Sequence, residues 1–161
     1  MIMPSSSRQR GFTFIELMTT LAILGVLVLV AAPLSQVVAQ RRKEHELRLA
    51  LIEIRQGIDD YKRAAEQGRI LLKIGDSGYP PSLDVLVQGV PDARSPTRQT
   101  IFFLRRVPAD PFAADQSQPA ASWGLRSFAS SADNPQPGAD VYDVYTRSTA
   151  TGLNGVPHRQ W

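Results

Sequence analysis

Residues 10–18 read Arg10-Gly11-Phe12-Thr13-Phe14-Ile15-Glu16-Leu17-Met18, and an apolar run continues from this stretch to Leu34. Glu16 is the only ionisable side chain between Phe12 and Leu34. The 23 residues of that segment would form about 35 Å of α-helix, which is enough to cross the hydrocarbon core of a bilayer. The sequence therefore predicts a membrane-spanning helix that carries one carboxylate near its start.

That carboxylate needs a physical reason. A charge inside a membrane helix costs from a few kcal/mol upward and usually marks a function. In the first helical turn Glu16 would complement the positive end of the helix dipole, which contributes only about 0.3–1 kcal/mol. This gain is too small to offset the cost of burying the charge in a single chain.

Three interpretations of the segment compete. It is a secretory signal peptide cut after Val37-Val38-Ala39, although Glu16 and the length of the apolar run argue against that. It is a signal anchor in which water and local thinning of the bilayer accommodate Glu16 near the interface. In the third interpretation the chain is cut between Gly11 and Phe12, so that Glu16 becomes the fifth residue of the mature protein.

The residues from Arg10 to Glu16 favour the third interpretation, because they resemble the type III signal peptide of type IV pilins and pseudopilins. The resemblance implies that a prepilin peptidase cuts after Gly11 and methylates the new N-terminal Phe12. It also implies that Glu16 meets the N-terminal amine of a neighbouring subunit and sets the stagger of a filament. The leader would lie in the cytoplasm, and the chain after Arg41 would lie on the opposite, periplasmic side of the inner membrane.

A periodic pattern follows the apolar run. Apolar residues recur at steps of three and four, and charged residues fall on the opposite side, which predicts an amphipathic helix that continues the membrane helix. Its apolar stripe should pack on a small sheet, and His45 lies off the stripe, where we expect solvent. The stripe consists of Leu47, Leu51, Ile54, Ile58 and Tyr61.

The rest of the chain reads as short elements joined by turns. Residues 69–74 are strand or helical turn, and Ser82 is a plausible cap for a short helix through Val87. Prolines on both sides of Ala109-Asp110 predict a rigid turn. Two alternating segments, 123–128 and 141–145, should pair as a hairpin.

The turns at Tyr79-Pro80 and at Pro108–Phe112 resemble those of the major pseudopilin of type II secretion systems, although Ala113-Ala114-Asp115 stands where that family commonly has Gly-Asn-Pro-Tyr. The resemblance implies an α+β, type IV pilin-like fold: a long N-terminal helix, membrane-spanning and then amphipathic, packed on a small antiparallel sheet. The expected parts are a cleaved leader (1–11), a transmembrane and filament-core helix (12–38), an amphipathic helix (39–67) and a small periplasmic α+β domain (68–161).

Composition argues against several functional classes. Without Arg8 and Arg10 of the leader, 16 basic residues face 15 acidic ones, so we expect no nucleic-acid partner. Cysteine is absent, which removes disulfides, thiol catalysis and thiolate metal sites. The only catalytic pair that we weigh is Ser127 or Ser130 with His158. We therefore predict no enzyme and no catalytic residue.

Calcium is a separate question, because the major pseudopilin family has a calcium site in its C-terminal loop. Calcium requires six to eight oxygen ligands, usually with several carboxylates. Residues 146–161 contain no Asp or Glu, and Asp133, Asp140 and Asp143 are better explained as loop caps or exposed side chains. We expect no cofactor and assign no metal ligand.

The functional expectation is a structural subunit of a type II secretion pseudopilus that drives protein export across the outer membrane. The resemblance implies an inner-membrane, single-pass protein with a periplasmic C-terminal domain. It also implies these partners: further copies of the chain, minor pseudopilins, the prepilin peptidase/methyltransferase, an inner-membrane assembly platform and secreted exoproteins. The alternative is a major or minor pilin of a type IV pilus, acting in adhesion, motility or DNA uptake.

Overall fold

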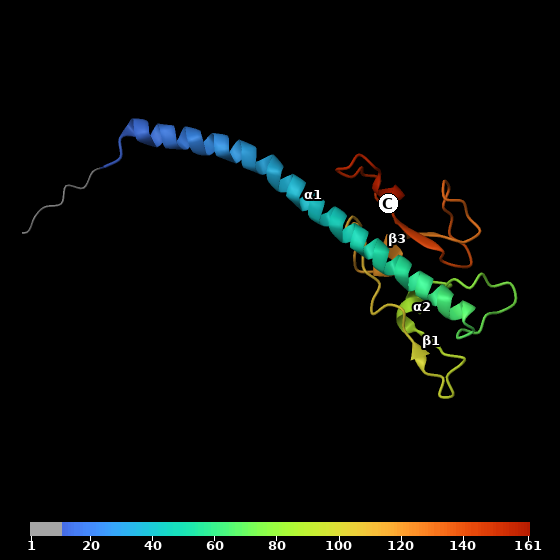
Figure 1. The fold of residues 1–161 in the computed structure, drawn as a ribbon. Helices are drawn as coiled ribbons and strands as arrows, with labels where there is room; N and C mark the ends of the chain where they lie inside the picture. Colours follow the sequence, from blue (N-terminus) through green and yellow to red (C-terminus); the bar gives the residue numbers. More distant parts are fainter. Residues whose placement is uncertain (1–10) are drawn as a thin grey trace, which may run out of the picture. The chain divides into compact units, whose positions relative to one another are not determined.

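The computed structural model describes residues 11–161, with the backbone alone for residues 30–33 (Figure 1). Apart from Gly11, the expected leader lies outside the described residues. The chain divides into two compact units, with the boundary between Gln40 and Arg41. The elements are helix α1 (Phe14–Glu66), helix α2 (Leu83–Gln88), strands β1 (Val90–Pro91) and β2 (Thr100–Ile101), helix α3 (Pro119–Ser122), strands β3 (Trp123–Arg126) and β4 (Asp143–Thr146), and the 3-10 helix η1 (His158–Gln160).

Helix α1 confirms the predicted long N-terminal helix and runs through both units. Because it is helical on both sides of residue 38, its backbone does not mark where the predicted membrane segment ends. In the first unit every described side chain between Phe12 and Ala39 is exposed. Among the described residues, α1 is the one helix long and apolar enough to cross a membrane.

The second unit builds its core on the other half of α1. The predicted stripe is buried over its whole length, from Leu47 to Tyr61, and His45 is exposed as expected. A Cβ placed on Gly57 would approach Cγ of Leu104 to 2.9 Å, which shows that Gly57 lies on this buried face. The residues that complete the core from other elements are Ile70, Leu83, Leu86, Leu104, Trp123, Val141 and Val144.

The strands form two separate antiparallel sheets, where a single small sheet was expected. The predicted hairpin is present: β3 pairs with β4, and Trp123 lies opposite Thr146. The second sheet joins β1 to β2, with Val90 opposite Ile101. Each of its strands is only two residues long, and β1 includes Pro91. Neither strand contains a run of alternating residues, so the sequence pattern did not predict this sheet. The fold is α+β, with a long helix and small antiparallel sheets.

The turn at Pro108–Phe112 is held by the carboxylate of Asp110, which is 1% exposed. Its Oδ1 accepts a hydrogen bond from the amide of Phe112 at 2.8 Å, and its Oδ2 accepts one from the hydroxyl of Thr146 at 2.5 Å. Trp123 donates from Nε1 to the carbonyl of Pro108 at 2.8 Å. The predicted rigid turn is therefore confirmed, and it is joined to both strands of the β3–β4 sheet.

Residues 69–74 form an irregular loop. Ile70 enters the core, but Leu71 and Ile74 are exposed, and neither sheet of the described residues includes this apolar segment. Asp76 closes a turn by accepting a hydrogen bond from the amide of Lys73 at 2.8 Å. The short helix predicted after Ser82 is α2, although the Ser82 side chain makes no capping hydrogen bond.

Candidate functional site

Two side chains cap the start of α1, and each accepts a hydrogen bond from the backbone amide of the other residue. The amide of Glu16 donates to Oγ1 of Thr13 at 3.3 Å, and the amide of Thr13 donates to Oε2 of Glu16 at 3.4 Å. The first helical bond runs from the amide of Leu17 to the carbonyl of Thr13 at 3.1 Å. This is the reciprocal arrangement of a capping box, in which a Thr and a Glu three residues later satisfy two backbone donors.

The capping box gives Glu16 a structural role that our sequence interpretation missed. Its signal was present, because Thr13-x-x-Glu16 directly before an apolar run is the pattern of such a cap. Among the described residues, Glu16 forms no ion pair, and its side chain is exposed. Among the described residues the carboxylate therefore has one polar contact, with the amide of Thr13, and no cation paired with it.

The Gly11–Phe12 bond precedes the helix in non-helical backbone. Phe12 is 80% exposed, and a Cβ placed on Gly11 would meet no atom within 4 Å. A peptidase can reach an exposed peptide bond in this conformation without unwinding a helix. The geometry suits cleavage after Gly11, but it does not test cleavage or methylation, and both stay predictions.

Further along α1, the hydroxyl groups bond to the helix itself. Thr19 donates to the carbonyl of Ile15 at 2.7 Å, and Thr20 donates to the carbonyl of Leu17 at 2.9 Å. A hydroxyl that bonds to its own helix needs no water, which is the condition that a bilayer imposes on polar groups. These two threonines are thus compatible with the membrane span that the apolar run predicts.

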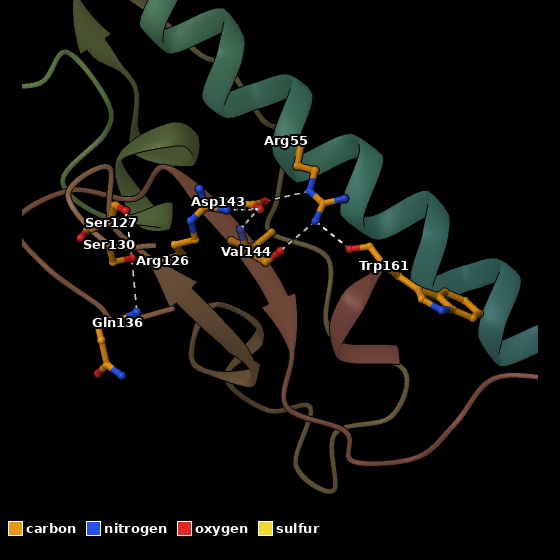
Figure 2. Close-up of polar contacts among 8 residues, drawn as sticks. All are labelled: Arg55, Arg126, Ser127, Ser130, Gln136, Asp143, Val144 and Trp161. Atoms are coloured by element: carbon orange, nitrogen blue, oxygen red, sulfur yellow. Dashed lines mark hydrogen bonds and ion pairs between the residues drawn. The ribbon is translucent and has the colours of Figure 1, made fainter. Parts of the chain in front are cut away.

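In the second unit, Arg55 of α1 connects three chain segments (Figure 2). Its Nε donates to Oδ1 of Asp143 at 2.8 Å, and its Nη2 donates to the carbonyls of Val144 at 3.3 Å and Trp161 at 2.8 Å. Arg126 lies on the other side of the Asp143 carboxylate, with Nη1 3.8 Å from Oδ2. These contacts join α1 to the β3–β4 sheet and to the last residue of the sequence.

Glu44 of α1, which is 7% exposed, makes a second contact between this helix and the residues after β4. Its Oε1 accepts a hydrogen bond from the amide of Leu153 at 2.9 Å and lies 3.6 Å from Nε2 of His158. The His158 ring packs between the rings of Phe112 and Trp161, with centroids 4.3 and 4.8 Å away. His158 is therefore a core residue of the closing segment, the name we give to residues 147–161 after β4.

The catalytic pair weighed from the sequence is not formed. Within the described residues neither nitrogen of His158 has a hydrogen-bond partner. Ser130 instead donates to the carbonyl of Ser127 at 3.1 Å and accepts a hydrogen bond from the amide of Gln136 at 3.3 Å (Figure 2). The two serines hold a loop.

Two of the three carboxylates considered for calcium are engaged in similar internal contacts, and the third, Asp133, is exposed. Asp140 accepts a hydrogen bond from the amide of Phe128 at 2.9 Å, and Asp143 pairs with Arg55. Among the described residues, no three His, Asp or Glu side chains are grouped so that they could hold a metal ion. The expectation that the chain binds no cofactor stays a prediction.

Two carboxylates of the second unit, Asp92 and Asp115, have a lowered pKa, and that of Asp92 is lowered by an arginine. Asp92 accepts hydrogen bonds through Oδ2 from Nη2 and Nε of Arg69, at 2.7 and 2.9 Å, and through Oδ1 from the amide of Arg94 at 2.9 Å. The Arg69 hydrogen bonds, followed by the Arg94 amide, lower the pKa of Asp92 below its usual value of 3.8. The pair ties residue 69, just after α1, to the loop that follows β1.

Comparison with known protein families matches residues 6–32 to the prokaryotic N-terminal methylation motif. The match contains Gly11, Phe12 and Glu16 and extends into the apolar segment. Searches of curated proteins and of solved structures found no match. The motif supports a type IV pilin-like structural subunit, which implies processing by a prepilin peptidase and polymerisation. The apolar helix is consistent with single-pass membrane anchoring.

Proposed function

We propose that this chain is a pilin-like subunit that is cleaved after Gly11, methylated at Phe12, held in the inner membrane by residues 12–38 and then polymerised into a periplasmic filament. The observation that carries the proposal is the N-terminal methylation motif, which extends into the first part of α1, where every described side chain up to Ala39 is exposed. An apolar helix without partners in its own chain needs lipid or other helices around it. In this proposal the membrane supplies the lipid before assembly, and the filament core supplies the other helices after it.

In this proposal Glu16 acts through its charge. Cleavage after Gly11 creates a new amine on Phe12, and the Glu16 carboxylate of one subunit pairs with the amine of the next. In a medium of low dielectric constant, such a pair is attractive enough to select one stagger between neighbouring helices. The capping box supports this role, because it leaves the carboxylate exposed while satisfying the backbone around it.

We assign the filament to a type II secretion pseudopilus. Support comes from the two Pro-containing turns, at Tyr79-Pro80 and Pro108–Phe112, and from the lack of the cysteines with which many pilins close a C-terminal loop. The partners would be minor pseudopilins, an assembly platform with its ATPase, and exported proteins. A strain lacking this chain should then retain its exoproteins in the periplasm. Normal export together with loss of surface pili would favour the type IV pilus instead.

The assembly role is tested by separating the charge of Glu16 from its cap. Glu16→Gln removes the charge but keeps an oxygen that can accept from the amide of Thr13, since Gln also serves in a capping box. Thr13→Ala removes the cap and keeps the charge. We expect both variants to be processed, Glu16→Gln to lose filaments, and Thr13→Ala to keep them, as seen by electron microscopy of sheared filaments.

The reverse result would contradict charge pairing. If Glu16→Gln builds normal filaments and Thr13→Ala does not, Glu16 acts as a helix cap only. Glu16→Ala, which removes both features, serves as the positive control for loss of assembly. Immunoblotting of membranes checks that each variant is present and has lost its leader.

A further inference from the structure

Three consecutive cations, Arg41, Arg42 and Lys43, open the second unit, and all are exposed. Between Glu16 and Arg41 the sequence has 24 residues without a charged side chain. As helix these would extend about 36 Å, somewhat more than the roughly 30 Å of a hydrocarbon core. If the apolar run spans a bilayer, the three cations therefore belong to its headgroup layer.

The nearest carboxylate does not neutralise these cations at the surface. Glu44 follows directly in sequence, but its side chain is buried and accepts a hydrogen bond from the amide of Leu153. Among the described residues Arg41, Arg42 and Lys43 form no ion pair. The closest exposed acid along the chain is Glu46, so a net positive charge remains on this turn of α1.

The directions of the three side chains distinguish between kinds of partner. Successive residues of an α-helix point about 100° apart, so three in a row span about 200° of the circumference. The ammonium of Lys43 lies 5.9 Å from the centre of the Phe112 ring, and the helical rotation places Arg42 and Arg41 about 100° and about 200° around the axis from Lys43. A protein partner on one side of the helix would reach only part of this arc, whereas a layer of headgroups surrounds the helix.

We propose that Arg41, Arg42 and Lys43 form a collar that binds the phosphate groups of anionic phospholipids, in the leaflet on the side of the folded unit. This inference rests on the membrane anchoring in the proposed function. Long basic side chains suit the task, because their apolar stems lie along the helix while the charged ends reach the phosphates. The collar would fix how far α1 enters the bilayer and would resist its withdrawal from an anionic membrane.

The collar is tested by measuring which lipids gather around the full chain in bilayers of phosphatidylglycerol and phosphatidylcholine. The chain has no cysteine, so a donor dye on His45→Cys labels a single exposed position close to the collar. Energy transfer is compared for acceptor dyes on the acyl chains of either lipid. We expect about threefold enrichment of phosphatidylglycerol over phosphatidylcholine, falling toward one at about 0.5 M salt.

Two triple variants identify the residues responsible. R41Q/R42Q/K43Q should abolish the enrichment, whereas R105Q/R106Q/R147Q removes the same charge from exposed positions elsewhere and should preserve it. Equal transfer to both acceptors in the parent chain, or enrichment that survives R41Q/R42Q/K43Q, would overturn the proposal. Flotation of the vesicles after an alkaline wash reports insertion independently, so failure of membrane anchoring is distinguished from failure of lipid selection.

Discussion

The two halves of α1 have the same backbone and opposite environments. From Phe12 to Ala39 every described side chain is exposed, including Leu27 at 58% and Leu29 at 75%. From Leu47 to Tyr61 the apolar stripe is buried by the sheets and loops of the second unit. Helical periodicity describes only the second half, because only there do apolar residues occupy one side of the helix.

The difference shows where each half finds its partners. The second half has its partners within the chain, so substitutions there should change the stability of the folded unit. The first half has no apolar partner among the described residues, so substitutions there should change membrane insertion and assembly. Burial therefore separates residues that stabilise the fold from residues that act outside it.

The largest effect should come from a pair of isoleucines two positions apart on α1. Ile54 is fully buried and Ile52 is 60% exposed. We expect Ile54→Ala to lower the free energy of unfolding by about 2–5 kcal/mol, because it leaves a cavity in the core. Ile52→Ala should change it by less than about 0.5 kcal/mol. Urea titration of the full chain in micelles, followed by the fluorescence of buried Trp123, measures both, and equal losses would contradict the assigned stripe.

A smaller effect should follow from Arg55, whose guanidinium contacts Asp143, Val144 and Trp161. We expect Arg55→Gln to destabilise the second unit by about 1–2 kcal/mol, since the side chain is partly exposed and water screens part of the interaction. Arg63→Gln is the matched control. Its ion pair with Asp60 lies on the surface and should contribute less than about 0.5 kcal/mol. Similar unfolding midpoints for Arg55→Gln and Arg63→Gln would contradict a stabilising role of the Arg55 contacts.

The smallest expected effect is the loss, at acidic pH, of the stability that Asp92 contributes to the folded chain. Because Arg69 lowers the pKa of Asp92 in the folded chain, the unfolded chain takes up this proton first as the pH falls. The stabilisation is present above about pH 4 and is lost below it, as the pH falls through the folded-state pKa. Arg69→Gln should therefore be less stable than the parent at neutral pH, with the difference shrinking in acid. A difference that does not change between neutral pH and about pH 3 would contradict this linkage.

The sequence predicted the elements that repeat a regular pattern. The apolar stripe from Leu47 to Tyr61 and the pairing of β3 with β4 follow from periods of about 3.6 and two residues, and both are confirmed. The β1–β2 sheet and the irregular loop at residues 69–74 were not predicted. Two-residue strands are too short to show a period, and an exposed apolar loop has the composition of a strand.

The candidate site was only partly predictable. Gly11, Phe12 and Glu16 were identified from the resemblance of residues 10–16 to the type III signal peptide of pilins, and the methylation motif covers all three. The capping box between Thr13 and Glu16 was not predicted, although the two residues have the spacing of three that it requires. The contacts of Arg55 and Glu44 with the closing segment were not predictable, since they join residues 106 and 109 positions apart.

The mass of the mature chain tests the central claim most directly. The protein is purified from membranes of its own host, and its N-terminal peptide is sequenced by mass spectrometry. We predict a chain that starts at Phe12 and carries one added methyl group on its amine, with Gly11→Ala blocking both changes. An N-terminus at residue 1, or one at Gln40 after a cut behind Ala39, would contradict the account.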